Sequence, residues 1–131
     1  MKSVDRYLKI ADEAIRNKGI AMNNIVPGAY NGAISSFGAS IVMSGVVPTI
    51  QFYLSDSDNR DSDTRKIIEA IAQIIYNSPD AGAEMLRQDV LHHINDRNER
   101  NRLRNNIVDA AIALKIMLRT YSFSKEENDL N

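Results

Sequence analysis

A run of 28 residues from Pro27 to Leu54 contains no Asp, Glu, Lys or Arg, although 25% of the chain is charged. Its apolar residues recur mostly at steps of three and four, the spacing of one helix face. These residues are Ile34, Phe37, Ile41, Val42, Val46, Ile50, Tyr53 and Leu54. Because a segment without charges has to be covered by other segments, we predict a central helical hairpin or kinked helix on which the remaining helices pack.

A membrane span is the first alternative for this run. The part from Phe37 to Leu54 has about the minimum length of a spanning helix. However, Ser, Thr and Gln residues and Pro48 interrupt it, and no Lys or Arg lies close to either end. Membrane helices normally carry an orienting excess of such cations in their flanking loops. The sequence therefore favours a buried core segment and predicts no contact with a membrane.

Length and composition point to one cytoplasmic domain. A chain of 131 residues is the usual size of a single domain with its own core. It has no cysteine, which excludes disulfides and thiolate metal sites and fits a reducing compartment. The net charge of −1 argues against a uniformly basic nucleic-acid binder. The first residues are amphipathic and mixed in charge, so we predict a helix there rather than a signal peptide.

Helical periodicity recurs in every long segment, and no segment alternates with period two. We therefore predict an all-α, single-domain bundle of about five or six helices. The domain is expected to cover residues 1–121, followed by a polar C-terminal tail at 122–131. Apart from the uncharged run, the predicted helices are 3–22 with Ser3 as N-cap, 64–76, 80–94 and 99–121.

The sequence offers little that could carry chemistry. It contains no phosphate-binding glycine loop, dinucleotide fingerprint or zinc-protease motif. Adjacent His92 and His93 would diverge by about 100° on a helix, so they cannot share a metal ion. We predict no enzyme activity, cofactor, metal ion or catalytic residue. One alternative stays open, because Arg87 followed by His92 resembles the loose motif of HEPN ribonucleases.

A cluster of arginines between residues 97 and 104 is the second unusual feature. Arg97, Arg100 and Arg104 would share one helix face through their spacing of three and four. Arginine has a fixed charge and a fork of donors that matches phosphate oxygens, so we predict that this row binds RNA phosphates. The alternative is a solvated helix start paired with Asp96 and Glu99. Two further cations are predicted to extend the RNA-binding surface: Arg16 and Lys18.

The run from Tyr30 to Tyr53 resembles the small α-helical subunit of the type III-B CRISPR effector, the Cmr or RAMP-module complex. In that family a tyrosine and a short helical run precede an I-x-x-N-G-L-x-Q-T-L-A-F segment. Here Ser44-Gly45-Val46 stands for N-G-L, and Thr49-Ile50-Gln51-Phe52 stands for T-L-A-F. The last helix is similar in character to the closing helix of the family. The predicted structural core includes Tyr30, Ile41, Gly45, Ile50 and Phe52.

The resemblance implies a non-catalytic role in antiviral defence. The small subunits of this family stack along the backbone subunits and line the groove where guide RNA pairs with target RNA. The implied partners are therefore the backbone subunit, further copies of this chain, and both RNAs through their phosphates. Ser35 and Ser36 depart from the family pattern, because lysines are common at these positions. A generic helical protein-interaction module, which needs no basic face, is the remaining alternative.

Overall fold

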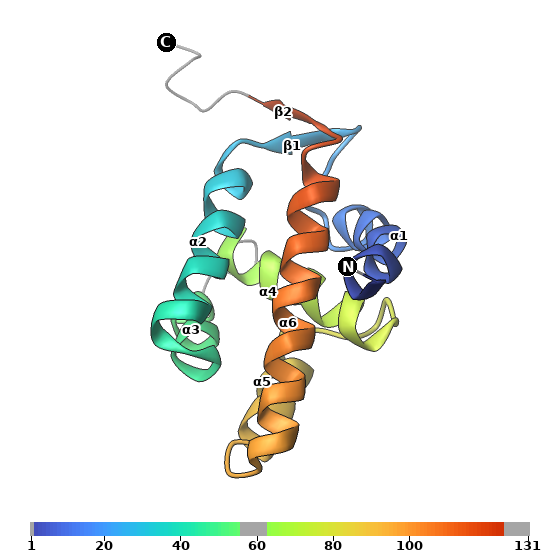
Figure 1. The fold of residues 1–131 in the computed structure, drawn as a ribbon. Coiled ribbons are helices and arrows are strands. Elements are labelled where there is room, and N and C mark those ends of the chain that lie inside the picture. The colour runs from blue at the N-terminus through green and yellow to red at the C-terminus, as the bar shows by residue number, and fades with distance from the viewer. Residues whose placement is uncertain (1, 56–62, 125–131) are drawn as a thin grey trace.

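The computed structural model describes residues 2–55 and 63–124 and confirms a mostly helical single domain (Figure 1). Six helices pack together in these ranges, and a small parallel sheet of two strands joins them. The helices are α1 (Lys2–Asn17), α2 (Ala29–Ser44), α3 (Val46–Tyr53), α4 (Asp63–Tyr76), α5 (Ala83–His92) and α6 (Arg97–Leu118). The strands are β1 (Ile25–Pro27) and β2 (Ser122–Ser124).

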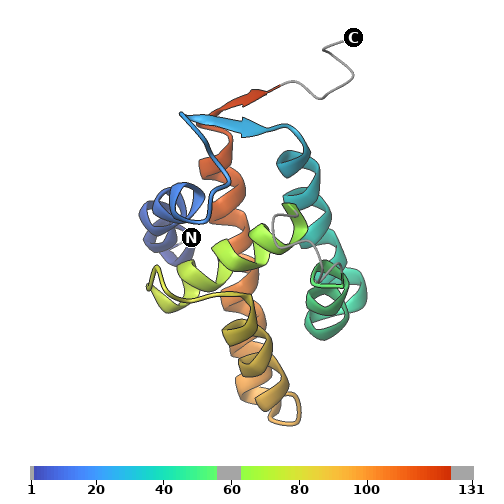
Figure 2. The same ribbon diagram turned by 180° about the vertical axis from the view of Figure 1, so that it is seen from behind.

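Helix α6, and not the uncharged run, lies at the centre of the bundle. It contacts α1, α2 and α4, and the two ribbon views show α1 and α2 on opposite sides of it with α4 crossing behind (Figures 1 and 2). Its buried residues recur along its length as Leu103, Ile107, Ala110, Ala111, Ala113, Leu114 and Leu118. The prediction that the other helices pack around the uncharged run is therefore wrong, because α2 and α3 form one flank of the domain.

The uncharged run folds as the predicted helical hairpin. Helix α2 ends at Ser44, and α3 folds back beside it after the single residue Gly45. The Phe37 and Tyr53 rings meet edge to face, with their centroids 5.2 Å apart. The Tyr53 hydroxyl also donates to the Ala33 carbonyl at 2.7 Å. One aromatic side chain of α3 therefore binds the middle of α2 through both packing and a hydrogen bond.

Three of the predicted core side chains are buried, and one is not. Tyr30, Ile41 and Ile50 have at most 4% of their surface exposed, whereas Phe52 is 71% exposed. Phe52 follows Ile50 by two residues, which places it about 160° around the helix from that buried side chain. The face that α3 buries consists of Thr49, Ile50 and Tyr53. The prediction for Phe52 is therefore wrong.

Gly45 has a backbone conformation that other residues rarely adopt, with φ 92° and ψ 173°. Such an extended, positive-φ geometry is essentially restricted to glycine and costs other residues about 1–3 kcal/mol. We expect Gly45→Ala to lower the free energy of unfolding by about that amount, measured by urea denaturation. Gly38→Ala is the matched control, because Gly38 lies within α2 with no atom near its missing Cβ. That change is expected to stabilise the helix by about 0.5–1 kcal/mol, and equal effects at both glycines would contradict the prediction.

Several helix ends differ from the predicted ones. Helix α1 ends at Asn17 rather than near residue 22, because Gly19 has φ 76° and closes the helix end. The Ile20 amide then donates to the Ile15 carbonyl at 3.0 Å, as in a Schellman motif. Helix α5 begins at Ala83 rather than residue 80, because Ser78 starts a separate turn instead of a helix.

The small sheet is the element that the sequence did not predict. Strand β1 pairs in parallel with β2, with Val26 opposite Phe123. Residues 122–124, assigned to the tail, therefore belong to the folded domain. The remaining tail residues, 125–131, lie outside the described residues. Strands of three residues are too short to show a period of two, which explains why the pattern was missed.

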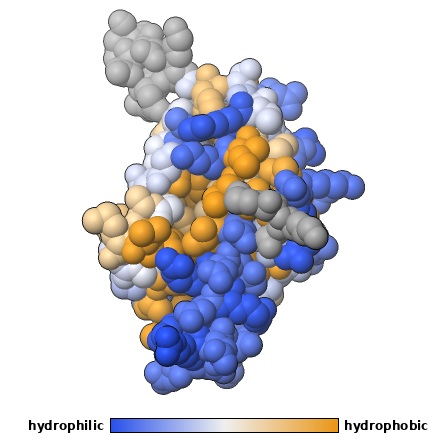
Figure 3. Space-filling view, viewed as in Figure 1, coloured by the Kyte–Doolittle hydropathy of each residue, from blue (hydrophilic) through white to orange (hydrophobic). Residues whose placement is uncertain are grey.

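Large apolar side chains remain exposed on the α2–α3 hairpin. Val42 is 71% exposed, Met43 85% and Phe52 71%. In the space-filling view, hydrophobic side chains gather on the side of the hairpin and along the flank of α6, while the lower part of the face is hydrophilic (Figure 3). None of the helices in the described ranges is long and apolar enough to cross a membrane.

Candidate nucleic-acid interface

The beginning of α6 positions the arginine row. Asp96 is the N-cap, and its carboxylate accepts a hydrogen bond from the Glu99 amide at 3.2 Å. This cap fixes the first turn, so that Arg97, Arg100 and Arg104 follow one another at helical spacing along one side of α6. The sequence pattern predicted this arrangement, although it did not identify Asp96 as the cap.

The acidic residues near this helix start do not neutralise the row. Glu99 pairs instead with Arg102, whose Nη2 lies 2.6 Å from Glu99 Oε2. Within residues 2–55 and 63–124, Arg97 and Arg104 make no ion pair or side-chain hydrogen bond. The alternative of a helix start paired with Asp96 and Glu99 therefore does not account for these two guanidinium groups.

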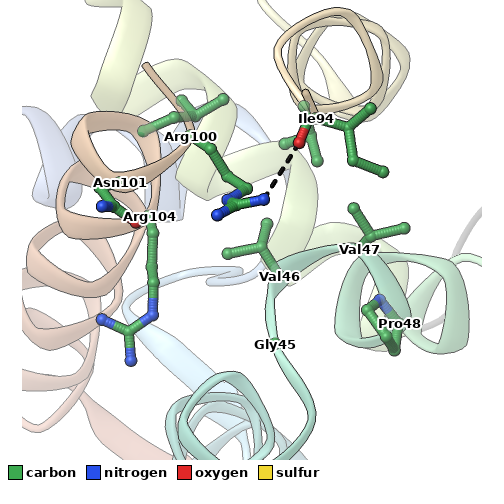
Figure 4. A pocket seen from close by; sticks show the side chains of 10 residues that line it. Gly45, Val46, Val47, Pro48, Ile94, Arg100, Asn101 and Arg104 are labelled. Atoms are coloured by element: carbon green, nitrogen blue, oxygen red, sulfur yellow. Dashed lines mark hydrogen bonds between the residues drawn. The ribbon is translucent and has the colours of Figure 1, made fainter. Parts of the chain in front are cut away.

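A cavity of about 240 Å³ lies beside the row, between the turn from α2 to α3 and the start of α6. We call it the α3–α6 pocket. It is lined by Gly45, Val46, Val47, Pro48, Val90, Ile94, Arg100, Asn101, Leu103 and Arg104. Figure 4 shows the Arg100 guanidinium reaching across the opening, where Nη1 donates to the Ile94 carbonyl at 3.2 Å. The pocket therefore combines apolar walls with a cationic rim.

Two distant parts of the sequence meet at this pocket. Gly45 ends α2 and turns the chain, so that Val46 and Val47 face the residues at the start of α6 (Figure 4). Sequence reasoning identified Gly45 and the arginines separately, but it missed Val46, Val47, Ile94 and Asn101 as lining residues. The only sequence signal for this pocket was the uncharged Gly-Val-Val-Pro turn, and it does not indicate which other segment the turn packs against.

The fold does not bring Arg16 into this row. Arg16 pairs with Asp12 at 2.8 Å, and its Nη1 donates to the Tyr121 hydroxyl at 3.4 Å. Tyr121 lies just beyond the last residue of α6, whereas Arg97 is the first residue of that helix. A helix of 22 residues is about 33 Å long. Arg16 therefore lies near the opposite end of α6, and its contact with RNA stays a prediction.

Lys18 has structural partners already. Its Nζ donates to the carbonyls of Pro79 at 3.1 Å and Ala81 at 2.5 Å, and lies 3.8 Å from Glu69 Oε1. Only 11% of its side chain is exposed. Glu69 in turn accepts a hydrogen bond from the Ala83 amide at the start of α5. Lys18 thus joins α1 to the loop between α4 and α5, a position that does not extend the arginine row.

Arg87 and His92, the residues of the alternative ribonuclease motif, are not brought together. Both lie on α5 five positions apart, which separates them by about 140° around the helix. The Arg87 guanidinium pairs with Glu84 at 2.9 Å and donates to Gln51 at 3.3 Å. His92 is exposed and contacts the ring of His93. This geometry gives the motif no support.

A second polar cluster, also missed from the sequence, connects α4 with the end of α5. The Tyr76 hydroxyl donates to Asp89 Oδ2 at 2.5 Å, and His93 Nδ1 lies 3.0 Å from Asp89 Oδ1. Burial, followed by the hydrogen bond to Asp89, raises the pKa of the Tyr76 phenol. The phenol therefore stays protonated near neutral pH and keeps donating. The cluster accounts for how α5 is held beside α4.

No group of three or more potential metal ligands occurs in the part of the chain that the structure describes. Comparisons with protein-family models, with curated proteins and with solved structures give no match for this chain. The sequence and the geometry of the arginine row with its pocket are therefore the basis for any functional conclusion.

Proposed function

We propose that this chain is a non-catalytic, RNA-binding subunit of a type III-B CRISPR ribonucleoprotein complex. The observation that supports this most is the row of Arg97, Arg100 and Arg104, in which none of the three guanidinium groups has an acidic partner among the described residues. Charged groups left without a partner at a helix start are suited to phosphate oxygens. The resemblance of the run Tyr30–Tyr53 to the small subunits of that complex supports guide and target RNA as the ligands.

The α2–α3 hairpin supports a role in assembly. Its exposed side chains include Val42, Met43 and Phe52, and it carries no charge that would need to be desolvated. Exposed apolar patches of this kind are typical of protein-binding surfaces. We propose that this hairpin contacts the other protein subunits, namely the backbone subunit and further copies of the chain. RNA would then bind at the start of α6, and protein would bind at Val42, Met43 and Phe52 of the hairpin.

The proposal predicts RNA binding that depends on salt and not on base sequence. Neutralisation of three phosphates on a single strand gives a slope of about −2 for the logarithm of affinity against that of salt, or a loss of about twenty-fold from 50 to 200 mM. Replacement of Arg97 and Arg104 by Glu is expected to weaken binding at low salt and to bring this slope to −1 or shallower. Fluorescence anisotropy with a labelled single-stranded RNA measures both quantities.

The matched control replaces two exposed cations elsewhere, Lys9 and Arg119, by Glu. It changes the net charge equally, so a general charge effect would weaken both variants alike. Circular dichroism should show that both remain folded. Equal loss of binding in both variants, or unchanged binding in the variant of Arg97 and Arg104, would contradict the proposed role of the row.

A further inference from the structure

We propose that the α3–α6 pocket holds one unstacked nucleobase of a single-stranded RNA. This inference rests on the proposed function, because the row of arginines must first bind the phosphates of the strand. It adds a base-binding site to a surface for which only phosphate contacts were predicted. The walls of the pocket, its cationic rim and an exposed amide beside it support the inference in turn.

The walls suit a flat body with apolar faces. Val46 and Val47 come from the α2–α3 side, Val90 and Leu103 come from α5 and α6, and Ile94 comes from the turn between those two helices. Asp and Glu are absent from the lining, so nothing there repels an RNA strand. A volume of about 240 Å³ equals that of about eight water molecules. This space is comparable to one nucleobase and is too small for a folded partner.

Arg100 supplies a plane at the opening of the pocket. Its guanidinium is held by the Ile94 carbonyl, which accepts from Nη1 at 3.2 Å (Figure 4). One hydrogen bond leaves most of the five guanidinium donors available. Guanidinium planes stack on the bases of unpaired RNA, and they add a cation–π attraction. A base that enters the pocket beside the valines would therefore lie within reach of the Arg100 guanidinium.

Asn101 lies next to Arg100 on the rim and is exposed. Its amide makes no hydrogen bond to any other residue in the described ranges. An amide both donates and accepts, so it can bind the edge of a base. Arg104 on one side and Arg97 on the other remain for the neighbouring phosphates. Along the start of α6, Arg97 and Arg104 would thus bind the flanking phosphates. Between them, Arg100 would stack on the base and Asn101 would bind its edge.

This arrangement requires an unpaired strand. Bases inside an A-form duplex are stacked and their major-groove edges are hard to reach, whereas single strands can turn a base outwards. The pocket should therefore distinguish single-stranded from double-stranded RNA, which phosphate contacts alone would not do. Part of the affinity should also depend on the presence of bases, although it need not depend strongly on which base is bound.

The test compares three probes of the same length: a single-stranded RNA dodecamer, a fully abasic dodecamer and a duplex. Loss of one stacked base is expected to weaken binding about ten-fold. The abasic strand should therefore bind about ten-fold more weakly, with the same salt slope. The duplex should also bind more weakly than the single strand. In addition, 2-aminopurine in the single strand should change its fluorescence on binding.

Val47→Met fills the pocket without altering charge, and Ile116→Met is a comparable change at an exposed apolar position of α6 outside the pocket. Val47→Met should bring the affinity for the dodecamer close to that for the abasic strand, while Ile116→Met should leave it unchanged. If the abasic strand or the duplex binds as tightly as the dodecamer with an intact salt slope, the pocket inference is wrong and the proposed RNA binding stands. If no probe binds, both fail.

Discussion

Replacement of Ile41 by Asp is expected to unfold the domain, whereas Phe52→Asp should leave it folded. The Ile41 side chain is 1% exposed on the buried side of α2, while Phe52 is 71% exposed on the same hairpin. An unpaired carboxylate in the core costs several kcal/mol at least. Such a cost approaches the whole stability of a domain, which is roughly 5–15 kcal/mol. Far-UV circular dichroism and urea denaturation of both variants measure the outcome.

The pair of substitutions also tests which face of α3 is buried. The predicted structural core implies equal sensitivity at both positions, because it includes both Ile41 and Phe52. The structure instead predicts a large difference between them. If Phe52→Asp unfolds the isolated domain as completely as Ile41→Asp, then the exposed position of Phe52 is wrong. A folded Phe52→Asp variant that no longer joins its complex would support the proposed role of the hairpin in assembly.

Lys18→Met should lower the free energy of unfolding by about 2–3 kcal/mol. The change keeps the length of the side chain but removes the ammonium group that Pro79 and Ala81 use as a donor. A buried polar group that loses its partner costs about 1–3 kcal/mol. The Glu69 carboxylate would also lose its counter-ion. The expected measurement is a lower urea midpoint with an unchanged slope, since the amount of surface exposed on unfolding stays the same.

Arg16→Met serves as the control for this effect. Arg16 is also a cation at the end of α1, but its side chain is 56% exposed and its ion pair with Asp12 lies on the surface. Exposed pairs contribute about 0–1 kcal/mol, so this variant should differ little from the parent. A stable Lys18→Met variant that has lost RNA affinity would restore Lys18 as an RNA ligand and contradict its structural role.

Local sequence signals predicted the helical class and much of the bundle. The apolar face of residues 64–76 and the stripe that begins at Leu103 follow from spacing alone, because each lies within one helix. A hairpin or kink within the charge-free run was predicted, although its position at Gly45 was not. The row of Arg97, Arg100 and Arg104 was also predicted from helical spacing. These features depend on neighbours only three or four positions away.

The remaining features depend on contacts between distant segments. Lys18 looks like any helix-terminal cation until the loop at Pro79 is placed against it. The apolar spacing includes Ile50 and Tyr53, which α3 buries, and leaves Phe52 out, so the placement of Phe52 in the core came from the resemblance alone. The α3–α6 pocket is the same kind of case as Lys18, since Val47 and Asn101 become neighbours only through the packing of two helices. Periodicity carries no information about such pairings.

The pairing of Ile25 with Ser122 in the small sheet links positions from nearly opposite ends of the chain. Such a contact has a large loop-closure entropy and cannot contribute until the helices between the strands are already in place. Two strands of three residues are also too few for independent stability. The sheet therefore forms late and opens readily, as a small cooperative unit of its own. Its opening would release the exposed strand β2, while β1 stays anchored because Val26 is fully buried in the core.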